Sequence, residues 1–284
     1  MSGIIFGTGF LGNRIGEKLR YAVIGRNEVD VLNYKLLSSF LDREKPAVVI
    51  NAVGKTHGNG ENSIDWCEGH KEETIESNVV GAINLSTACS KRGIHFVHLG
   101  SGCIYQGDNN GRGFTEDDEP NFYGPQFYAK TKIDAERTLK NLPGLILRIR
   151  MPIDDRPHQR NLIDKLLGYQ KVIDAPNSMT TVPEMISALK FLIGKRTNGV
   201  YNFTNPRTIS AAEIMGLYNR LVRKHEFQIM SIEELDEITV GKRSNCYLNT
   251  KKLDGVLKGF EYELPEIHEA VQKCLIKYKK NMKI

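Results

Sequence analysis

Three glycines separate a short apolar run from a helical pattern near the N-terminus. Residues 4–6 are apolar, Gly7, Gly9 and Gly12 follow, and apolar residues then recur every four positions. A GxGxxG loop between a strand and a helix permits a tight turn and lets backbone N–H groups approach a pyrophosphate at the helix N-terminus. A plain glycine-rich turn is the alternative. We therefore expect a dinucleotide-binding loop formed by Gly7, Gly9, Phe10, Leu11 and Gly12.

The pattern that follows this loop predicts an α/β fold. Apolar runs of strand length, such as residues 47–50, 96–99 and 145–149, alternate with helical patterns in the first half of the chain. This alternation indicates a Rossmann-type, doubly wound parallel sheet. After Pro152 the pattern changes to short helices and loops, which predicts a smaller C-terminal α/β substrate lobe. The expected bounds are 1–152 for the dinucleotide-binding core, with 177–203 returning to it, and 153–284 for the lobe.

The composition limits the class of protein. The chain has 284 residues, of which 40% are hydrophobic and 26% are charged, with a formal charge of +5. These values exclude a disordered chain, and the small charge excess gives no reason to expect nucleic acid as a partner. No apolar run reaches the ~18 residues of a membrane span, and no signal-peptide pattern is visible. The five cysteines form no CxxC, so we expect no disulfide framework, no metal and a cytoplasmic location.

Residues after the second and third predicted strands indicate which dinucleotide is bound. Arg26 stands where a fold that reads NAD usually offers an acid to the ribose hydroxyl. An arginine there can pair with a 2′-phosphate, so NADP(H) is the expected cofactor, with a solvated surface arginine as the alternative. The residues expected to line the cofactor trough after the third strand are Asn51, Ala52, Val53 and Thr56.

A YxxxK motif lies on a predicted helix over residues 128–139. Its Tyr128 and Lys132 are four positions apart, which places both side chains on one helix face. An ammonium near a phenol favours the phenolate, so the phenol can exchange a proton with a carbonyl oxygen. Ser101 follows a predicted strand ending at Leu99, at the carboxyl edge of the sheet where such folds bind ligands. Together the three residues indicate carbonyl reduction, with Tyr128 and Lys132 also expected to contact the cofactor.

These motifs and several other stretches carry a family resemblance. The chain resembles the extended short-chain dehydrogenase/reductases, in the dTDP-4-dehydrorhamnose reductase branch, and within it the nucleotide-rhamnose synthase/epimerase-reductases. One departure is visible, because the family's loop is usually GxxGxxG and Phe6 stands at its first position. The similar stretches are residues 65–68, 102–104, 120–122, 128–132, 147–152, 176–180, 201–206 and 243–245.

The resemblance implies a catalytic set. Ser101, Tyr128 and Lys132 would carry out reduction, and Cys103 and Lys165 would form an acid/base pair for epimerisation. The hydrogens on C3 and C5 flank a C4 ketone, so removal of either leaves an enolate that the reductase residues can stabilise. Inversion needs a base on one face and an acid on the other. Without the resemblance, Cys103 would be a buried apolar residue and Lys165 a helix-surface lysine.

The resemblance also implies where the sugar nucleotide is bound. Arg243 has the fork geometry that suits a diphosphate, with a surface salt bridge as the alternative. The other residues expected to contact the substrate are Asn161, Asn177, Ser178, Met179, Thr180 and Asn245.

The implied function is that of a bifunctional enzyme. It would act after a 4,6-dehydratase and convert UDP-4-keto-6-deoxy-D-glucose to UDP-L-rhamnose with NADPH. Three alternatives stay open: a dTDP-4-dehydrorhamnose reductase without epimerase activity, a GDP-fucose synthase-like enzyme and a non-catalytic dinucleotide-sensing subunit. The Gly102-Cys103 pair favours the bifunctional enzyme over the simple reductase. The expected partner is the nucleotide sugar, without nucleic acid or membrane, and both the nucleobase and a homodimer stay open.

Overall fold

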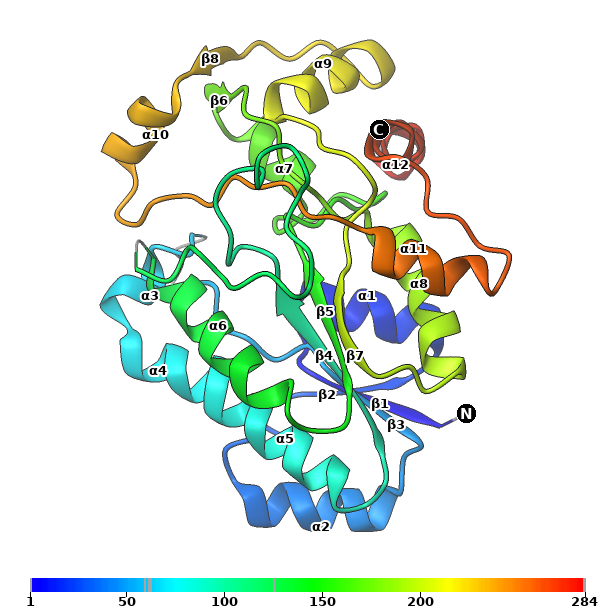
Figure 1. Ribbon diagram of the computed structural model, residues 1–284. Coiled ribbons are helices and arrows are strands. Elements are labelled where there is room, and N and C mark those ends of the chain that lie inside the picture. Colours follow the sequence, from blue (N-terminus) through cyan, green and yellow to red (C-terminus); the bar gives the residue numbers. More distant parts are fainter. Residues whose placement is uncertain (1, 59, 61–62, 125, 283–284) are drawn as a thin grey trace. The chain divides into compact units, whose positions relative to one another are not determined.

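The computed structural model describes residues 2–58, 60, 63–124 and 126–282 (Figure 1). The chain forms two compact units. Unit 1 comprises Met1–Ile104, Phe122–Arg148 and Leu189–Tyr201, and unit 2 comprises Tyr105–Asn121, Ile149–Ala188 and Asn202–Ile284.

This division differs from the bounds expected from the sequence. The chain first enters unit 2 at Tyr105 rather than after residue 152, and the returning segment is Leu189–Tyr201 rather than 177–203. The early crossing has a physical reason in long-range backbone pairing. The N–H of Gly107 donates to the carbonyl of Asn245 at 2.8 Å, and Phe114 pairs in the same way with Tyr247 at 2.8 Å. Partners this far apart in the sequence leave no local pattern.

Unit 1 is built on a six-stranded parallel sheet, which confirms the Rossmann-type expectation. The strand order is β2-β1-β3-β4-β5-β7. Because β2 and β3 lie on opposite sides of β1, the connections after β1 and β3 diverge and leave a crevice at the carboxyl edge of the sheet. The strands are β1 (Gly3–Phe6), β2 (Ala22–Ile24), β3 (Val48–Asn51), β4 (His95–Ser101), β5 (Leu145–Ile149) and β7 (Gly199–Asn202).

The helices of unit 1 cover both faces of this sheet. Ile4 and Phe6 of β1 belong to an apolar cluster with Leu37 and Leu85 of the helices on one face. Ile5, which points the opposite way, lies near Gly16 of the helix on the other face. The helices and one π-helical turn are α1 (Phe10–Leu19), α2 (Tyr34–Glu44), α3 (Trp66–Gly69), α4 (Lys71–Ile75), η1 (Glu76–Val80), α5 (Gly81–Ser90) and α6 (Phe127–Leu139).

Unit 2 packs short helices around a second apolar core. Its strands β6 (Lys171–Ile173) and β8 (Gln228–Met230) pair in parallel, and Ser210 forms a capping box at the start of α9. Its core includes Ile163, Ile214 and Val271. The helices are α7 (Leu162–Leu167), α9 (Ala211–Leu221), α10 (Ile232–Ile238), α11 (Lys251–Lys258) and α12 (Ile267–Asn281), while α8 (Val182–Gly194) has residues in both units.

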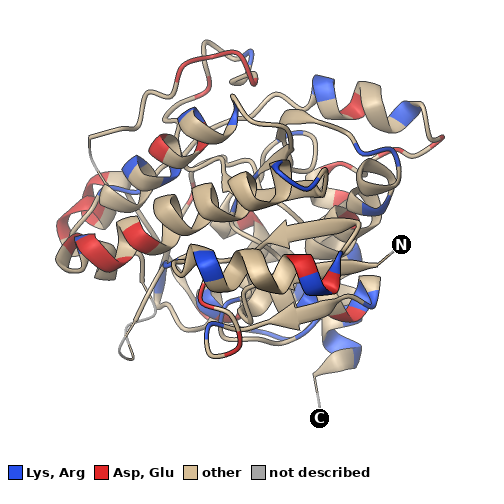
Figure 2. Cartoon of the chain, turned by 90° about the horizontal axis from the view of Figure 1, so that it is seen from below, with Lys and Arg blue, Asp and Glu red and all other residues tan. Residues whose placement is uncertain are grey.

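Charge is dispersed along the chain. Figure 2 marks the positions of basic and acidic residues, which alternate along several helices and include acidic stretches. One group of acidic residues lies on α3, α4 and η1, at Glu68, Glu72, Glu73 and Glu76. Within the described residues, no helix is long and apolar enough to cross a bilayer. The same residues contain no cluster of three or more His, Cys, Asp or Glu side chains arranged to hold a metal ion.

Candidate active site

The glycine loop after β1 is held against the loop after β3. Gly7 has a φ of +111°, and a Cβ atom there would lie 2.7 Å from the carbonyl carbon of Ala52. A Cβ atom on Gly12 would collide with the carbonyl oxygen of Gly7. The chain's own packing therefore demands glycine at both positions.

Gly9 is glycine for a different reason. Apart from its two neighbours in the chain, a Cβ atom there would meet no heavy atom of the described residues within 4 Å. Gly9 is the N-cap of α1, which has no capping side chain and no acidic residue in its first turn among the described residues. The positive end of the helix dipole thus faces open space, which fits a bound phosphate. These features fit the pyrophosphate of a dinucleotide.

The two kinds of glycine give a matched pair of variants. We expect Gly12→Ala to lose about 1–3 kcal/mol of unfolding free energy or more, because the added methyl collides with the backbone of Gly7. We expect Gly9→Ala to cost no more than about 1 kcal/mol but to weaken NADPH binding at least tenfold, because the methyl occupies the space left for phosphate. Thermal unfolding and NADPH titration check both. Unchanged NADPH affinity in Gly9→Ala would place the pyrophosphate elsewhere.

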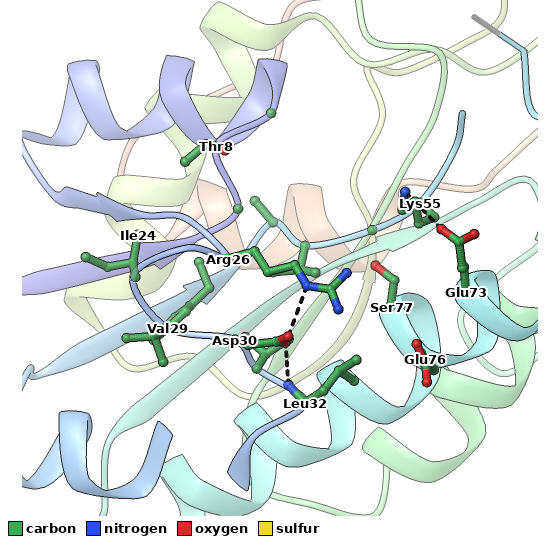
Figure 3. Close-up of a pocket in the computed structure, with 17 residues that line it drawn as sticks. Thr8, Ile24, Arg26, Val29, Asp30, Leu32, Lys55, Glu73, Glu76 and Ser77 are labelled. Atoms are coloured by element: carbon green, nitrogen blue, oxygen red, sulfur yellow. Dashed lines mark hydrogen bonds and ion pairs between the residues drawn. The ribbon is translucent and has the colours of Figure 1, made fainter. Parts of the chain in front are cut away.

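A pocket opens at the crevice of the sheet. Figure 3 shows it between the glycine loop, the segment after β2, the segment after β3 and the helical stretch α4–η1. Of the expected cofactor residues, Gly7, Gly9, Arg26, Ala52 and Val53 line it. The full lining is Phe6, Gly7, Thr8, Gly9, Ile24, Arg26, Val29, Asp30, Val31, Leu32, Ala52, Val53, Gly54, Lys55, Glu73, Glu76 and Ser77.

Asn51 does not line this pocket, but its side chain holds the backbone of Val53, which does. Its side chain is fully buried, its Oδ1 accepts from the N–H of Val53 at 2.9 Å, and its Nδ2 lies 3.0 Å from Nδ1 of His98. Burial, reinforced by the charge of Lys132, holds the pKa of His98 well below its usual value. A neutral imidazole can accept the Asn51 hydrogen bond, so the pair fixes the start of the cofactor loop.

Ser101 and Cys103 stand at the carboxyl end of β4. Ser101 is the last residue of the strand, so the expectation that the strand ends at Leu99 was two residues short. The extension is possible because Gly100 lies close against β5, where a Cβ atom would be 3.3 Å from the carbonyl oxygen of Leu147. The Ser101 Oγ accepts from the N–H of Cys103 at 3.1 Å. The hydroxyl proton of Ser101 is thus directed away from this contact.

Lys132 reaches the same edge from α6. Its side chain is buried, and its Nζ donates to the carbonyl of Leu99 at 3.4 Å. A Cβ atom on Gly54 would lie 3.8 Å from that Nζ, so the cofactor loop passes close to the ammonium. Burial lowers the pKa of Lys132 to about 8, an effect opposed by the charges of Cys103 and Glu136. Tyr128, one turn earlier on α6, lies on the same helix face.

The buried Lys132 should cost stability. Its folded pKa of about 8 is below the unfolded value of 10.5, so between these pH values the unfolded chain holds more protons and stability rises with pH. At pH 7 both states are protonated and the full penalty applies. We expect Lys132→Met to raise the unfolding free energy at pH 7 by about 1–3 kcal/mol, a gain that shrinks above pH 8.

Chemical denaturation at a series of pH values measures that gain. Lys140→Met, at the exposed end of the same helix, is the control and should change little. A Lys132→Met protein that is less stable than the wild type at pH 7 would contradict the prediction.

Asn78 joins three elements around Lys132. Its Oδ1 accepts from the N–H of Lys55 at 2.7 Å, and its Nδ2 donates to the Lys55 carbonyl and to Thr131 Oγ1, each at 3.1 Å. These bonds connect η1, the cofactor loop and α6. Asn78 therefore ties the backbone of the cofactor loop to α6.

In unit 2, Asn161 is fully buried and its amide is saturated. Its Oδ1 accepts from the N–H groups of Asp154 and Ile163, and its Nδ2 donates to the carbonyls of Asp154 and Arg156. These contacts cap α7 and fix the loop before it. The geometry therefore gives Asn161 a structural role, and its contact with the substrate stays a prediction.

Most of the other expected substrate residues surround a buried arginine. Arg150 is 1% exposed, and its guanidinium donates to the Ser178 carbonyl, to Asn177 Oδ1 and to the Ser244 hydroxyl and carbonyl. Thr180 Oγ1 accepts from the Arg150 N–H, and Asn245 accepts from Asn177. Met179 belongs to the apolar core. All five residues expected at the sugar nucleotide are buried, and their contact with the substrate stays a prediction. They are Asn177, Ser178, Met179, Thr180 and Asn245.

Lys165 and Arg243 keep the properties expected of ligand-binding residues. Both are partly exposed, and burial together with the charges of Arg160 and Arg243 lowers the pKa of Lys165 to about 8. Three cations in one unit favour an anionic ligand. Asp164, next to Lys165 on α7, accepts from the Tyr278 hydroxyl of α12 at 2.8 Å. The C-terminal helix therefore helps to hold the helix that carries Lys165.

Comparison with models of protein families shows the family to which this chain belongs. The model of the family described as RmlD substrate binding domain matches residues 4–280. The chain belongs to this family.

The relatives of this RmlD-family chain carry names of sugar-nucleotide reductases, epimerases or synthases. A bifunctional dTDP-4-dehydrorhamnose 3,5-epimerase/dTDP-4-dehydrorhamnose reductase of Arabidopsis thaliana is 37% identical, covering 84% of this chain and 78% of the relative. A trifunctional UDP-glucose 4,6-dehydratase/epimerase/reductase of the same plant is 34% identical over 97% of this chain, which spans only 41% of that longer protein. The L780 UDP-rhamnose synthase of Acanthamoeba polyphaga mimivirus has a crystal structure with a TM-score of 0.91 and 33% identity, covering 98% and 99% of the two chains. The RmlD-family chain is therefore an oxidoreductase-type enzyme.

Several pocket residues of this RmlD-family chain were not expected from the sequence. Asp30, Lys55, Glu73, Glu76 and Ser77 all line the cofactor pocket. Thr56 was expected there but does not line it. Phe10, Leu11 and Gly12 form the start of α1 behind the loop instead of the pocket wall. Only Asp30 carried a sequence signal, as an acid shortly after Arg26.

Proposed function

We propose that the chain reduces the C4 ketone of a nucleotide-linked 4-keto-6-deoxyhexose with NADPH after epimerising C3 and C5. The observation that carries this proposal is the grouping of Ser101, Cys103 and Lys132 at the end of β4, in the same unit as the dinucleotide pocket. Bound NADPH would supply the hydride. The names of the relatives support both chemistries.

The reductive step depends on donors aimed at the C4 oxygen. Tyr128 gives its phenolic proton to the developing alkoxide, and the ammonium of Lys132 stabilises the phenolate left behind. Ser101 already accepts from the Cys103 N–H, so its own hydroxyl proton is available for the same oxygen. Two donors on one oxygen stabilise its negative charge in the transition state.

The epimerisation uses the same donors for a different anion. A base removes the proton from C3 or C5, the electrons move to the C4 oxygen as an enolate, and Tyr128 and Ser101 stabilise that oxyanion. An acid then returns a proton to the opposite face. We assign these two roles to Cys103 and Lys165. Two observations support the choice: Cys103 follows Ser101 by two residues, and the pKa of Lys165 is about 8.

We assign one proposed ligand group to residues of each unit. The glycine loop and Arg26 would bind NADPH in unit 1, and Arg243 in unit 2 would pair with the diphosphate of the sugar nucleotide. We propose UDP-4-keto-6-deoxy-D-glucose as substrate and UDP-L-rhamnose as product, with a 4,6-dehydratase supplying the substrate. The trifunctional relative, which includes that dehydratase by name, supports this order.

Product analysis tests the proposal. The purified chain is incubated with NADPH and, in separate reactions, with UDP- or dTDP-4-keto-6-deoxyglucose, with the corresponding 3,5-epimerised sugar nucleotide or with GDP-4-keto-6-deoxymannose. The products are identified by NMR. Formation of a rhamnose-configured product from either nucleotide supports both activities and identifies the base. If only the sugar nucleotide that is already epimerised at C3 and C5 is reduced, the chain is a reductase without epimerase activity. Turnover only of GDP-4-keto-6-deoxymannose would instead favour a GDP-fucose synthase-like enzyme, and no turnover at all the sensing subunit.

A further inference from the structure

The segment after β2 turns sharply at the rim of the dinucleotide pocket. The N–H groups of Glu28 and Val29 both donate to the carbonyl of Gly25, at 3.1 and 3.0 Å. The turn places Arg26 and Asp30 side by side, and both line the pocket (Figure 3).

Asp30 makes two hydrogen bonds through its two carboxylate oxygens. Its Oδ1 accepts from the backbone N–H of Leu32 at 3.0 Å, and its Oδ2 accepts from Nε of Arg26 at 3.0 Å. The Asp30 side chain is 31% exposed, whereas the Arg26 side chain is 69% exposed. The carboxylate is therefore the fixed partner, anchored to the backbone, and the long arginine is the side chain that it restrains.

The bond to Nε leaves the other end of the guanidinium turned outward. Figure 3 shows the two terminal nitrogens of Arg26 pointing away from Asp30. A guanidinium recognises a phosphate through two parallel N–H donors, and these terminal groups form such a fork. Holding the side chain before the ligand arrives reduces the rotamer freedom that binding must remove.

We propose that Asp30 is a positioning residue that aims Arg26 at the 2′-phosphate of NADPH. This inference rests on the proposed function, in which NADPH is the cofactor. The negative charge of Asp30 also repels a phosphate, but solvent screens that repulsion at the exposed pocket rim. The hydrogen bond to Nε acts directly on the side chain that binds, so positioning outweighs repulsion.

Calorimetric titration of the full chain with adenosine 2′,5′-bisphosphate and with 5′-AMP tests this. The dissociation constant of 5′-AMP divided by that of adenosine 2′,5′-bisphosphate measures the contribution of the 2′-phosphate to binding, without any turnover. This quotient is called the ratio below. Arg26→Ala should bring the ratio close to one. Asp30→Ala should reduce the ratio about two- to fivefold, the range expected for an exposed ion pair. Asp30→Asn keeps an oxygen acceptor for Nε and should restore most of the ratio.

Two controls separate positioning from other effects. In the Arg26→Ala background, Asp30→Ala should have no further effect on the ratio, because no arginine remains to be aimed. Asp42→Ala removes another aspartate that holds an arginine, since Asp42 pairs with Arg92 at 2.8 Å but does not line the pocket. That control should leave the ratio unchanged.

Each contrary result has a distinct meaning. An increased ratio in both Asp30→Ala and Asp30→Asn would show that the carboxylate only repels phosphate, and would overturn the inference. If Asp30→Ala weakens the binding of both nucleotides by the same factor, Asp30 contacts the adenosine that they share. That result would also overturn the inference. A wild-type ratio near one would overturn the choice of NADPH in the proposed function and this inference with it. A high wild-type ratio that Asp30→Ala leaves unchanged would overturn this inference alone.

Discussion

Tyr128→Phe is expected to reduce NADPH oxidation by a factor of about 10²–10⁴. The substitution removes one oxygen atom and leaves the aromatic ring in place on α6. Without the phenol, the alkoxide at C4 loses its proton donor, and Ser101 can offer a hydrogen bond but its aliphatic hydroxyl is a much weaker acid than a phenol. The decrease in NADPH absorbance with substrate in excess measures the effect.

A matched variant separates this chemistry from general damage. Tyr123→Phe removes the hydroxyl of a nearby, exposed tyrosine that donates to Asp134 at 3.2 Å, and it should retain wild-type turnover. NADPH affinity should change less than the rate in Tyr128→Phe. Turnover within tenfold of the wild type in Tyr128→Phe would show that another group protonates the C4 oxygen.

The sheet and the cofactor loop could be predicted because their signals are local. The strand at residues 145–149 has the same bounds in the sequence pattern and in the structure, and α6 begins one residue before the expected Tyr128. Burial on both faces of a parallel sheet forces continuous apolar runs, and a glycine required by backbone collision cannot be replaced. Gly12 is such a position.

The substrate residues could not be predicted in the same way. The family resemblance implies that Asn177 and Asn161 contact the sugar nucleotide, and no local pattern in the sequence shows what else their side chains bind. In the folded chain their amides satisfy backbone groups and the guanidinium of Arg150 inside unit 2. A buried arginine needs such partners, and they come from segments far apart in the sequence. Only the folded chain shows which groups an asparagine side chain contacts, and the sequence alone does not show them.

Cys103→Ala and Lys165→Ala are expected to lose deuterium incorporation at C3, C5 or both. Proton removal exchanges carbon-bound hydrogen with solvent, whereas hydride transfer does not, so substrate recovered from heavy water reports epimerisation alone. General acid/base residues contribute about 10²–10⁴ in rate, and we expect losses of that size. NADPH binding should be normal in both variants, because neither residue lines the dinucleotide pocket.

Three comparison variants sharpen this experiment. Cys103→Ser keeps the shape but is a much weaker acid, so its exchange should fall between the wild type and Cys103→Ala. Lys171→Ala removes an exposed lysine of the same unit as Lys165 and should exchange normally. Tyr128→Phe should still exchange, more slowly than the wild type, because the enolate loses one stabilising contact while the bases remain.

The pH dependence of exchange then distinguishes the roles of the pair. With a pKa of about 8, Lys165 is mostly protonated at pH 7 and becomes neutral as the pH rises through 8. If Lys165 is the base, exchange at the carbon it serves increases over that range, and if it is the acid, product formation decreases. Lys165→Ala should remove whichever trend is seen. If Cys103→Ala exchanges as fast as the wild type, Cys103 is only a packing residue, and a reductase without epimerase activity becomes the better assignment.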